Sequence, residues 1–221
     1  MKTIPMGTLC ALACAMSAVP ALAADSTGES HWYATAVAGA NFMSDQSLSF
    51  SGASLAGSTE ASFDTGLSTG AAVGYAFNRN WRVEAEFMYQ SVDHDGVELA
   101  GSSLPSGNYA STSLALNGLY SINAFGSDAV RTYVGAGLAW LTEVDVDFEQ
   151  GRNELSYSGD GFGVQLLGGA RYDFGERFFV DAGLRYLVGG EVTMDGEGST
   201  PGRVKADYEP WGVTVGVGLR F

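Results

Sequence analysis

The sequence predicts an all-β fold, an eight-stranded antiparallel transmembrane β-barrel with short periplasmic turns and long external loops. Three observations lead to this fold class: a two-residue alternation of apolar side chains, a leader followed by a chain without long apolar runs, and connections that alternate in length. The alternation is clearest in "WGVTVGVGLRF" at 211–221, where all large apolar side chains fall on one side. Because successive side chains of a strand point to opposite faces, this pattern is typical of a β-strand.

The leader has the features of a secretory signal peptide. A lysine at position 2, an apolar stretch and the small-residue cleavage site "ALA" at 21–23 follow one another in the expected order. We therefore expect two regions, a signal peptide at 1–23 and an outer-membrane β-barrel domain at 24–221. A lipoprotein signal around Cys14 is the minor alternative, but the apolar run continues past that residue.

Cleavage at this site would remove both cysteines of the sequence, Cys10 and Cys14. The mature chain would then have no disulfide, no thiolate metal site and no cysteine nucleophile. It would hold 10 basic and 25 acidic residues, a net charge of −15, which argues against nucleic acid as a partner. No mature segment has 18 consecutive apolar residues, so crossing a bilayer would require a closed barrel, in which every backbone polar group is paired.

Eight segments carry the alternation and are the expected strands: 32–43, 63–77, 81–91, 108–121, 130–143, 161–173, 177–189 and 208–221. Short connections at 78–80, 122–129 and 174–176 alternate with long polar ones at 44–62, 92–107, 144–160 and 190–207. Outer-membrane barrels combine short periplasmic turns with longer external loops, whereas a soluble sandwich has no reason to sort its connections in this way. Aromatic residues gather near the strand ends, as in the two girdles of such barrels: Trp32, Tyr33, Trp81, Tyr120, Trp140, Tyr172, Trp211 and Phe221.

The chain resembles the opacity-type and OmpA-type barrels of bacterial outer membranes, including rickettsial-type major surface antigens. The resemblance rests on "NWRVEAEFMYQ" at 80–90, "GFGVQLLGGARYDF" at 161–174, "VDAGLRYL" at 180–187 and the terminal aromatic residue after an alternating strand. It implies export through the periplasm to the outer membrane of a Gram-negative bacterium. The implied partners are outer-membrane lipid, lipopolysaccharide and the barrel-assembly machinery, for which Phe221 would be the assembly signal. It also implies a monomer without a cofactor.

The strand parity predicts a charge network inside the barrel. The side opposite the apolar face carries five arginines and four carboxylates: Arg82, Glu84, Glu86, Arg131, Arg171, Asp173, Asp181, Arg185 and Arg220. The interior of an eight-stranded barrel is just wide enough to be filled by side chains, and charges confined there must pair. We expect an arginine–carboxylate plug, in which Glu84, Glu86 and Asp181 meet Arg82, Arg131, Arg171 or Arg220.

Four carboxylates at alternate positions form a weak candidate for a metal site: Glu143, Asp145, Asp147 and Glu149. Calcium prefers six or more oxygen ligands. Residues two apart on a strand lie nearly 7 Å apart, roughly twice the rise per residue, which is too far for most pairs to share an ion. The favoured interpretation is a solvated acidic face of a hairpin above the membrane.

His94 lies between Asp93 and Asp95 near the outer end of the third expected strand, and an acid–histidine pair at a barrel rim could activate water or a hydroxyl. A solvated loop histidine is the favoured interpretation. The segment 190–207, rich in glycine and mixed charges, has the composition of a mobile loop.

Three functions therefore stand open. The leading hypothesis is a non-enzymatic surface protein, structural or adhesin- or antigen-like through its external loops, with host or cell-surface ligands as partners. The alternatives are a narrow porin-like channel for small solutes and a rim hydrolase or acyltransferase that uses His94.

Overall fold

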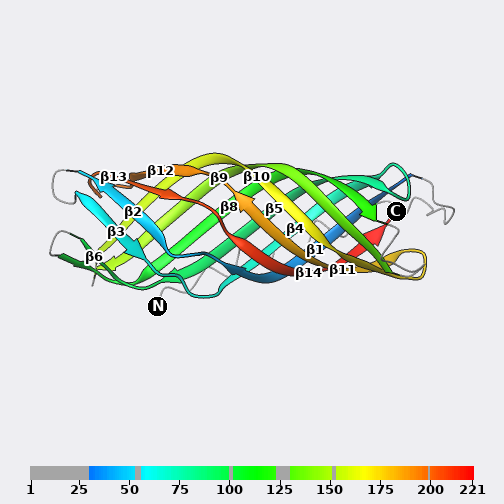
Figure 1. The fold of residues 1–221 in the computed structure, drawn as a ribbon, viewed down its shortest axis with the longest axis horizontal. Helices are drawn as coiled ribbons and strands as arrows, with labels where there is room; N and C mark the ends of the chain where they lie inside the picture. Colours follow the sequence, from blue (N-terminus) through cyan, green and yellow to red (C-terminus); the bar gives the residue numbers. More distant parts are fainter. Residues whose placement is uncertain (1–29, 53–55, 100–101, 123–129, 151–152, 199) are drawn as a thin grey trace.

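The computed structural model describes residues 30–221 except 53–55, 100–101, 123–129, 151–152 and 199, and these residues form an all-β structure. Eight long strands make a closed antiparallel barrel: β1 (His31–Phe42), β4 (Gly66–Ala76), β5 (Trp81–His94), β8 (Gly107–Ile122), β9 (Val130–Gln150), β10 (Asn153–Phe174), β11 (Phe178–Val188) and β14 (Trp211–Arg220). Each pairs with the next in this series, and β14 pairs with β1 to close the ring (Figure 1). The predicted fold class is confirmed.

The barrel has two unlike ends. At one end the turn at 77–80 and the turn at 175–177 join neighbouring strands directly, and we call this the turn end. At the other, the loop end, six shorter strands extend the structure: β2 (Gln46–Ser51), β3 (Gly57–Ala61), β6 (Val97–Leu99), β7 (Ser102–Leu104), β12 (Glu191–Gly196) and β13 (Arg203–Asp207). Figure 1 shows β2, β3, β6 and β13 at the end opposite the carboxyl terminus.

The long connections are therefore not the loops that the sequence predicts. Strands β9 and β10 run through the expected loop at 144–160, and β12 and β13 pair with each other within the segment whose composition suggested mobility. β12 also joins β10, and β13 joins β2, so that these strands continue the barrel wall beyond its first part. The expectation of irregular loops was wrong because these segments pair as strands and bury apolar side chains against one another, which a polar average composition hides.

The outer face of the barrel is apolar from the turn end up to the level at which the shorter strands begin. Its largest exposed side chains include Leu138, which is 70% exposed, and Phe162, which is 73% exposed. Each of the eight long strands carries at least one exposed large apolar side chain, which is typical of a surface that faces lipid. The prediction that Tyr33 belongs to an aromatic girdle is wrong, because its side chain is fully buried in the barrel interior, where its ring contacts the ring of Phe179. Within the described residues no helix is long and apolar enough to cross a membrane.

Candidate functional site

The barrel interior is the candidate site, and it consists of three layers along the barrel axis. Charged side chains fill the turn end. Uncharged polar side chains fill the middle, among them Thr35, Asn41, Ser68, Gln90, Ser111, Asn117, Gln165 and Thr214. A cluster of apolar side chains fills the loop end. In the charged and the polar layer, the alternation of each strand places these residues inward, because the residues between them along the strand carry the exposed apolar side chains.

Glu84 on β5 is the centre of the charged layer. Its Oε1 atom accepts a hydrogen bond of 2.6 Å from the Tyr33 hydroxyl and lies 3.5 Å from Arg82 Nε and 3.6 Å from Arg171 Nη2. Arg171 also donates from Nε to Asp181 Oδ2 at 3.0 Å, and its guanidinium lies 3.8 Å from the centroid of the Phe179 ring. Burial of these charges is tolerated because each carboxylate has cationic or hydroxyl partners.

Two further groups complete the charged layer. Glu86 accepts hydrogen bonds from both terminal nitrogens of Arg185, at 3.0 Å and 2.8 Å, in a bidentate pair. Asp173 accepts a hydrogen bond of 2.6 Å from Arg131 on one carboxylate oxygen and a hydrogen bond from Arg220 on the other. A planar guanidinium suits such shared and forked contacts better than an ammonium group does.

The structure thus places all nine predicted network residues inside the barrel and brings each into an ion pair with another member. Two details of the pairing differ from the expectation. Glu86 meets Arg185, and Arg131 and Arg220 both meet Asp173. Parity alone reveals which residues point inward, but their partners depend on the stagger of the strands around the ring, which the sequence does not show.

The apolar layer at the loop end was not predicted. Among its members, Leu48, Leu141, Val144, Val146, Phe148, Met194 and Val204 are at most 1% exposed. Tyr208 extends the polar layer into it and contacts the Ser111 hydroxyl, and burial raises the pKa of Tyr208 to about 12. This cluster resembles the core of a soluble domain, with the polar side chains on its outside.

A single extra residue in β9 makes this inversion possible. Leu141 pairs with Ser113, but Glu143 pairs with the adjacent Thr112, so Thr142 is a β-bulge, and its hydroxyl donates to the Thr112 carbonyl at 3.0 Å. A shift of one residue moves every following side chain to the opposite face. The even-numbered residues of β9 therefore face outward up to 140 and inward from 144 onward.

The candidate catalytic residue His94 lies inside this apolar layer and is 2% exposed. Its Nδ1 atom is 2.9 Å from the Asp95 carbonyl oxygen and its Nε2 atom is 2.9 Å from the Asp147 carbonyl oxygen. Phe148 packs against its ring at a centroid distance of 4.9 Å. The interpretation as a solvated loop residue is wrong, and this position also gives the imidazole no access to a substrate in water. Its contacts are those of a structural residue that joins the end of β5 to β9.

The acidic row on β9 lies on the outer face, as the bulge requires. Glu143 is exposed and Asp145 is partly exposed, while the side chain of Glu149 lies outside the described residues. Partial burial, with Glu143 nearby, raises the pKa of Asp145 to about 6, although a hydrogen bond from Ser158 lowers it. Among the described residues, no three histidine, cysteine or acidic side chains are grouped in a way that could hold a metal ion.

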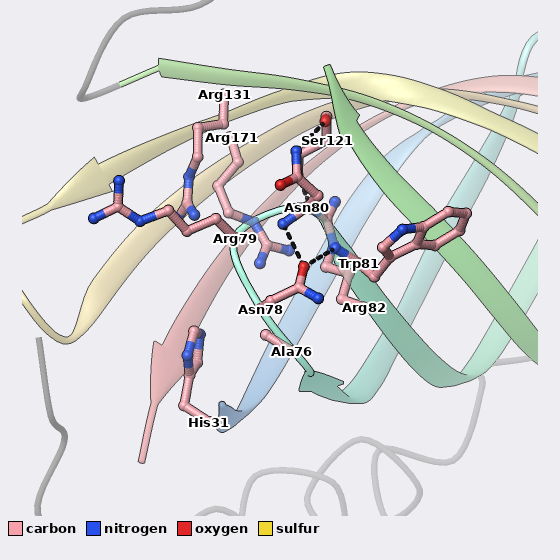
Figure 2. Close-up of a pocket in the computed structure, with 10 residues that line it drawn as sticks. All are labelled: His31, Ala76, Asn78, Arg79, Asn80, Trp81, Arg82, Ser121, Arg131 and Arg171. Carbon is pink, nitrogen blue, oxygen red and sulfur yellow. Dashed lines mark hydrogen bonds between the residues drawn. The ribbon is translucent and has the colours of Figure 1, made fainter. Parts of the chain in front are cut away.

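A small cavity of about 40 Å³ opens at the turn end, beside the charged layer (Figure 2). Four arginines line it, Arg79, Arg82, Arg131 and Arg171, together with His31, Ala76, Asn78, Asn80, Trp81 and Ser121. The "NRN" turn has a fixed shape because Asn78 Oδ1 accepts from the backbone nitrogens of Asn80 and Trp81, both at 2.9 Å. Sequence analysis missed this cavity, although three of its arginines belong to the predicted network.

Phe221 follows β14 at the turn end. Its backbone nitrogen donates to the Trp32 carbonyl at 2.9 Å, and its carbonyl accepts from Trp32 at 3.2 Å. These bonds extend the seam between the first and last strands of the barrel. The expected signal peptide at 1–23 lies outside the described residues.

Known proteins with similar sequences are found in outer membranes. The family described as "Outer membrane protein beta-barrel domain" matches residues 11–221. An outer membrane protein of Gluconacetobacter diazotrophicus is 30% identical over 149 residues, which make up 63% of this chain and 39% of that protein. This chain therefore spans about two fifths of the length of that curated relative.

Solved structures share the fold. OprG from Pseudomonas aeruginosa superimposes with a TM-score of 0.65 at 19% identity, covering 88% of this chain and 97% of OprG. AlkL gives a TM-score of 0.54 at 18% identity, with 92% and 95% covered, and Neisserial surface protein A gives 0.52 at 19%, with 86% and 97% covered. At these identities the likeness concerns the fold alone.

Proposed function

The chain belongs to the outer membrane protein β-barrel family and is located in the outer membrane, and we propose that it is a non-enzymatic, non-conducting surface protein. In this function the barrel holds a rigid, acidic β-domain outside the cell, and that domain contacts positively charged partners. The single observation that carries the proposal is that the interior is filled at both levels, by ion pairs in the membrane and by an apolar core outside it.

The distribution of charge supports contact with basic partners. The external segments 43–66, 92–107, 142–161 and 189–210 contain 17 of the 25 acidic residues but only 3 of the 11 basic ones. The rest of the sequence holds 8 of each, so nearly all of the net charge is external. An electrostatic field of one sign raises the association rate with partners of the opposite charge, and this effect weakens as the ionic strength rises.

Neither alternative function has comparable support. A channel requires a continuous aqueous path, whereas Met88, Leu141 and Phe148 occupy the interior at successive depths with at most 1% exposure. A rim enzyme requires an accessible base, whereas both nitrogens of His94 contact backbone carbonyls.

Binding of a lysine-rich peptide to the purified barrel in phosphatidylcholine nanodiscs tests the proposal without the background of lipopolysaccharide. We expect binding that weakens as salt is raised and that is several-fold weaker in the triple variant Asp93→Asn, Glu143→Gln and Asp160→Asn. Glu176→Gln, which removes an exposed carboxylate at the turn end, is the control and should bind as the wild type does. Equal binding by the triple variant and the control would overturn the assignment of the partner.

A further inference from the structure

We propose that the cavity at the periplasmic mouth of the barrel binds a small oxyanion, a free phosphate or carboxylate group. The inference rests on four features of this end of the barrel: donors that lack partners, an excess of positive charge, a preformed cavity wall and a suitable size.

Arg82 supplies the donors. It lines the cavity and is only 6% exposed, yet its Nε and Nη2 atoms have no hydrogen-bond acceptor. Its Nη1 atom donates to the Ser121 hydroxyl at 3.3 Å, and its guanidinium lies 4.3 Å from the centroid of the Tyr133 ring. Nε has only the 3.5 Å ion-pair contact with Glu84, and both N–H groups of Nη2 lack an acceptor, whereas buried guanidinium groups ordinarily satisfy theirs.

The charge balance around Arg82 leaves room for an anion. Apart from the separate Arg185–Glu86 pair, four arginines of this layer meet three carboxylates. Arg82 and Arg171 share Glu84, Arg171 also contacts Asp181, and Arg131 and Arg220 share Asp173. Arg79 of the turn adds a further positive charge at the cavity itself. Among the described residues, no acidic side chain lines the cavity. A bound oxyanion would accept from Arg82 and neutralise the excess charge.

The wall of the cavity is shaped before any ligand arrives. Figure 2 shows the turn residues Asn78 and Asn80 in the middle of the site, with dashed lines joining Asn78 to its backbone donors. Asn80 Nδ2 also donates to the Ser121 carbonyl at 3.2 Å, which ties the turn to β8. Such prior order reduces the entropy cost of binding.

The size of the cavity restricts the ligand class. The cavity volume of about 40 Å³ is enough for roughly three water molecules, since one water molecule requires about 10–15 Å³ of such space. A carboxylate or one face of a phosphate fits, whereas a nucleotide or a sugar phosphate would have to remain mostly outside the barrel.

Titration of inorganic phosphate into the refolded barrel, followed by the ³¹P line width at constant ionic strength in a phosphate-free detergent, tests the proposal. We expect saturable broadening in the wild type and competition by acetate. Arg82→Gln should weaken phosphate affinity about tenfold or more, as loss of a charge-assisted contact does.

Because Arg82 also contacts Glu84, its variant could fail to fold, and Arg79→Gln avoids this difficulty. Arg79 is exposed in the turn at 77–80. Arg177 is exposed in the turn at 175–177, lies outside the cavity and is the matched control. We expect Arg79→Gln to weaken phosphate binding about threefold, the loss of one partly screened charge, and Arg177→Gln to leave it unchanged. Equal affinities for these two variants would overturn the site.

A lipid headgroup could supply the same chemistry. If phosphate fails to bind while phosphatidylglycerol nanodiscs, compared with phosphatidylcholine nanodiscs, raise the unfolding temperature of the wild type but not of Arg79→Gln, the assignment to a free anion is overturned. Stabilisation by phosphate alone, lost in Arg79→Gln, supports it.

Discussion

The barrel has a membrane part, which runs from the turn end to the level of Thr142, and an external part, which lies beyond it at the loop end. Several strands run through both parts, but apolar and charged side chains face opposite directions in the two. In the membrane part, Leu138 and Phe162 face outward while Glu86 and Arg171 are buried. In the external part, Val146 is buried while Glu143 faces outward. The difference follows from the surrounding solvent: lipid excludes charge from the outer face, whereas water excludes apolar side chains from it. One continuous strand serves both surroundings only if its pattern or its register changes at the boundary.

Strands β9 and β10 make that change in two different ways. In β10 the inward residues are odd-numbered throughout, and the sequence itself changes, from Tyr157 inside to Gln165 inside and Phe162 outside. In β9 the apolar residues stay even-numbered, and the bulge at Thr142 reverses the direction in which they point.

Deletion of Thr142 should have the largest effect, because it removes this reversal. Val144, Val146 and Phe148 would then turn toward water and the carboxylates between them toward the core, which no local adjustment can accommodate. We expect the external segments to lose protection from protease added to intact cells, while the membrane part stays assembled. Thr142→Ala keeps the residue count and loses only the hydrogen bond to Thr112, about 1 kcal/mol. Equal protection in the deletion variant and the wild type would refute the role of the bulge.

Loss of the carboxylates in the membrane part should rank second. The double variant Glu84→Ala, Glu86→Ala removes the carboxylate shared by Arg82 and Arg171 and the partner of Arg185, although Arg171 keeps Asp181. Breaking each buried pair costs about 3–5 kcal/mol, so the double variant should lose more than one such amount. A urea titration, in which heat-modifiable migration measures the fraction of folded barrel, should show a large loss of stability. Asp195→Ala, which breaks an exposed pair with Arg203, is the control and should cost at most about 1 kcal/mol. A similar effect in both variants would mean that the network is not the main polar support of the barrel.

A smaller loss is expected when the external core is truncated. Phe148 is fully buried against Phe50 and His94, so Phe148→Ala should cost about 3–5 kcal/mol. Protease sensitivity of the external segments on intact cells measures this loss. Leu138→Ala, on the lipid face of the same strand, opens no internal cavity and should leave the external segments protected. Loss of protection in both variants would argue against two separately packed parts.

The smallest effect concerns pH and the external carboxylates. The folded pKa of Asp145, about 6, lies above its ordinary value of 3.8, so the folded state binds this proton more tightly than the unfolded state. Stability therefore falls as the pH rises from about 4 to about 6 and is level above that range. Because Asp145 is partly exposed, we expect a fall of only about 1 kcal/mol. Asp145→Asn should abolish this fall in urea titrations, whereas Asp160→Asn on the neighbouring strand should retain it.

The sequence predicts the membrane part better than the external part, for a physical reason. Lipid enforces a strict apolar face, so the alternation around Trp81 and Phe87 reveals the strand and the inward position of Glu84. In β9 the large apolar residues keep the even-numbered positions on both sides of Thr142, at Trp140 and again at Val144, and one polar residue at the even position between them is too weak a signal to mark a bulge. The periplasmic cavity was hidden for a similar reason, because it depends on which side chains from β5, β8, β9 and β10 meet across the ring.

Planar-bilayer recording of the refolded wild-type barrel tests the central claim most directly, since an interior closed by ion pairs at one level and by an apolar core at the other leaves no continuous aqueous path. We expect no steady conductance, and Phe148→Ala alone should not create one because the charged layer remains. A large, steady, ohmic conductance in the wild type would contradict the account and favour the channel alternative.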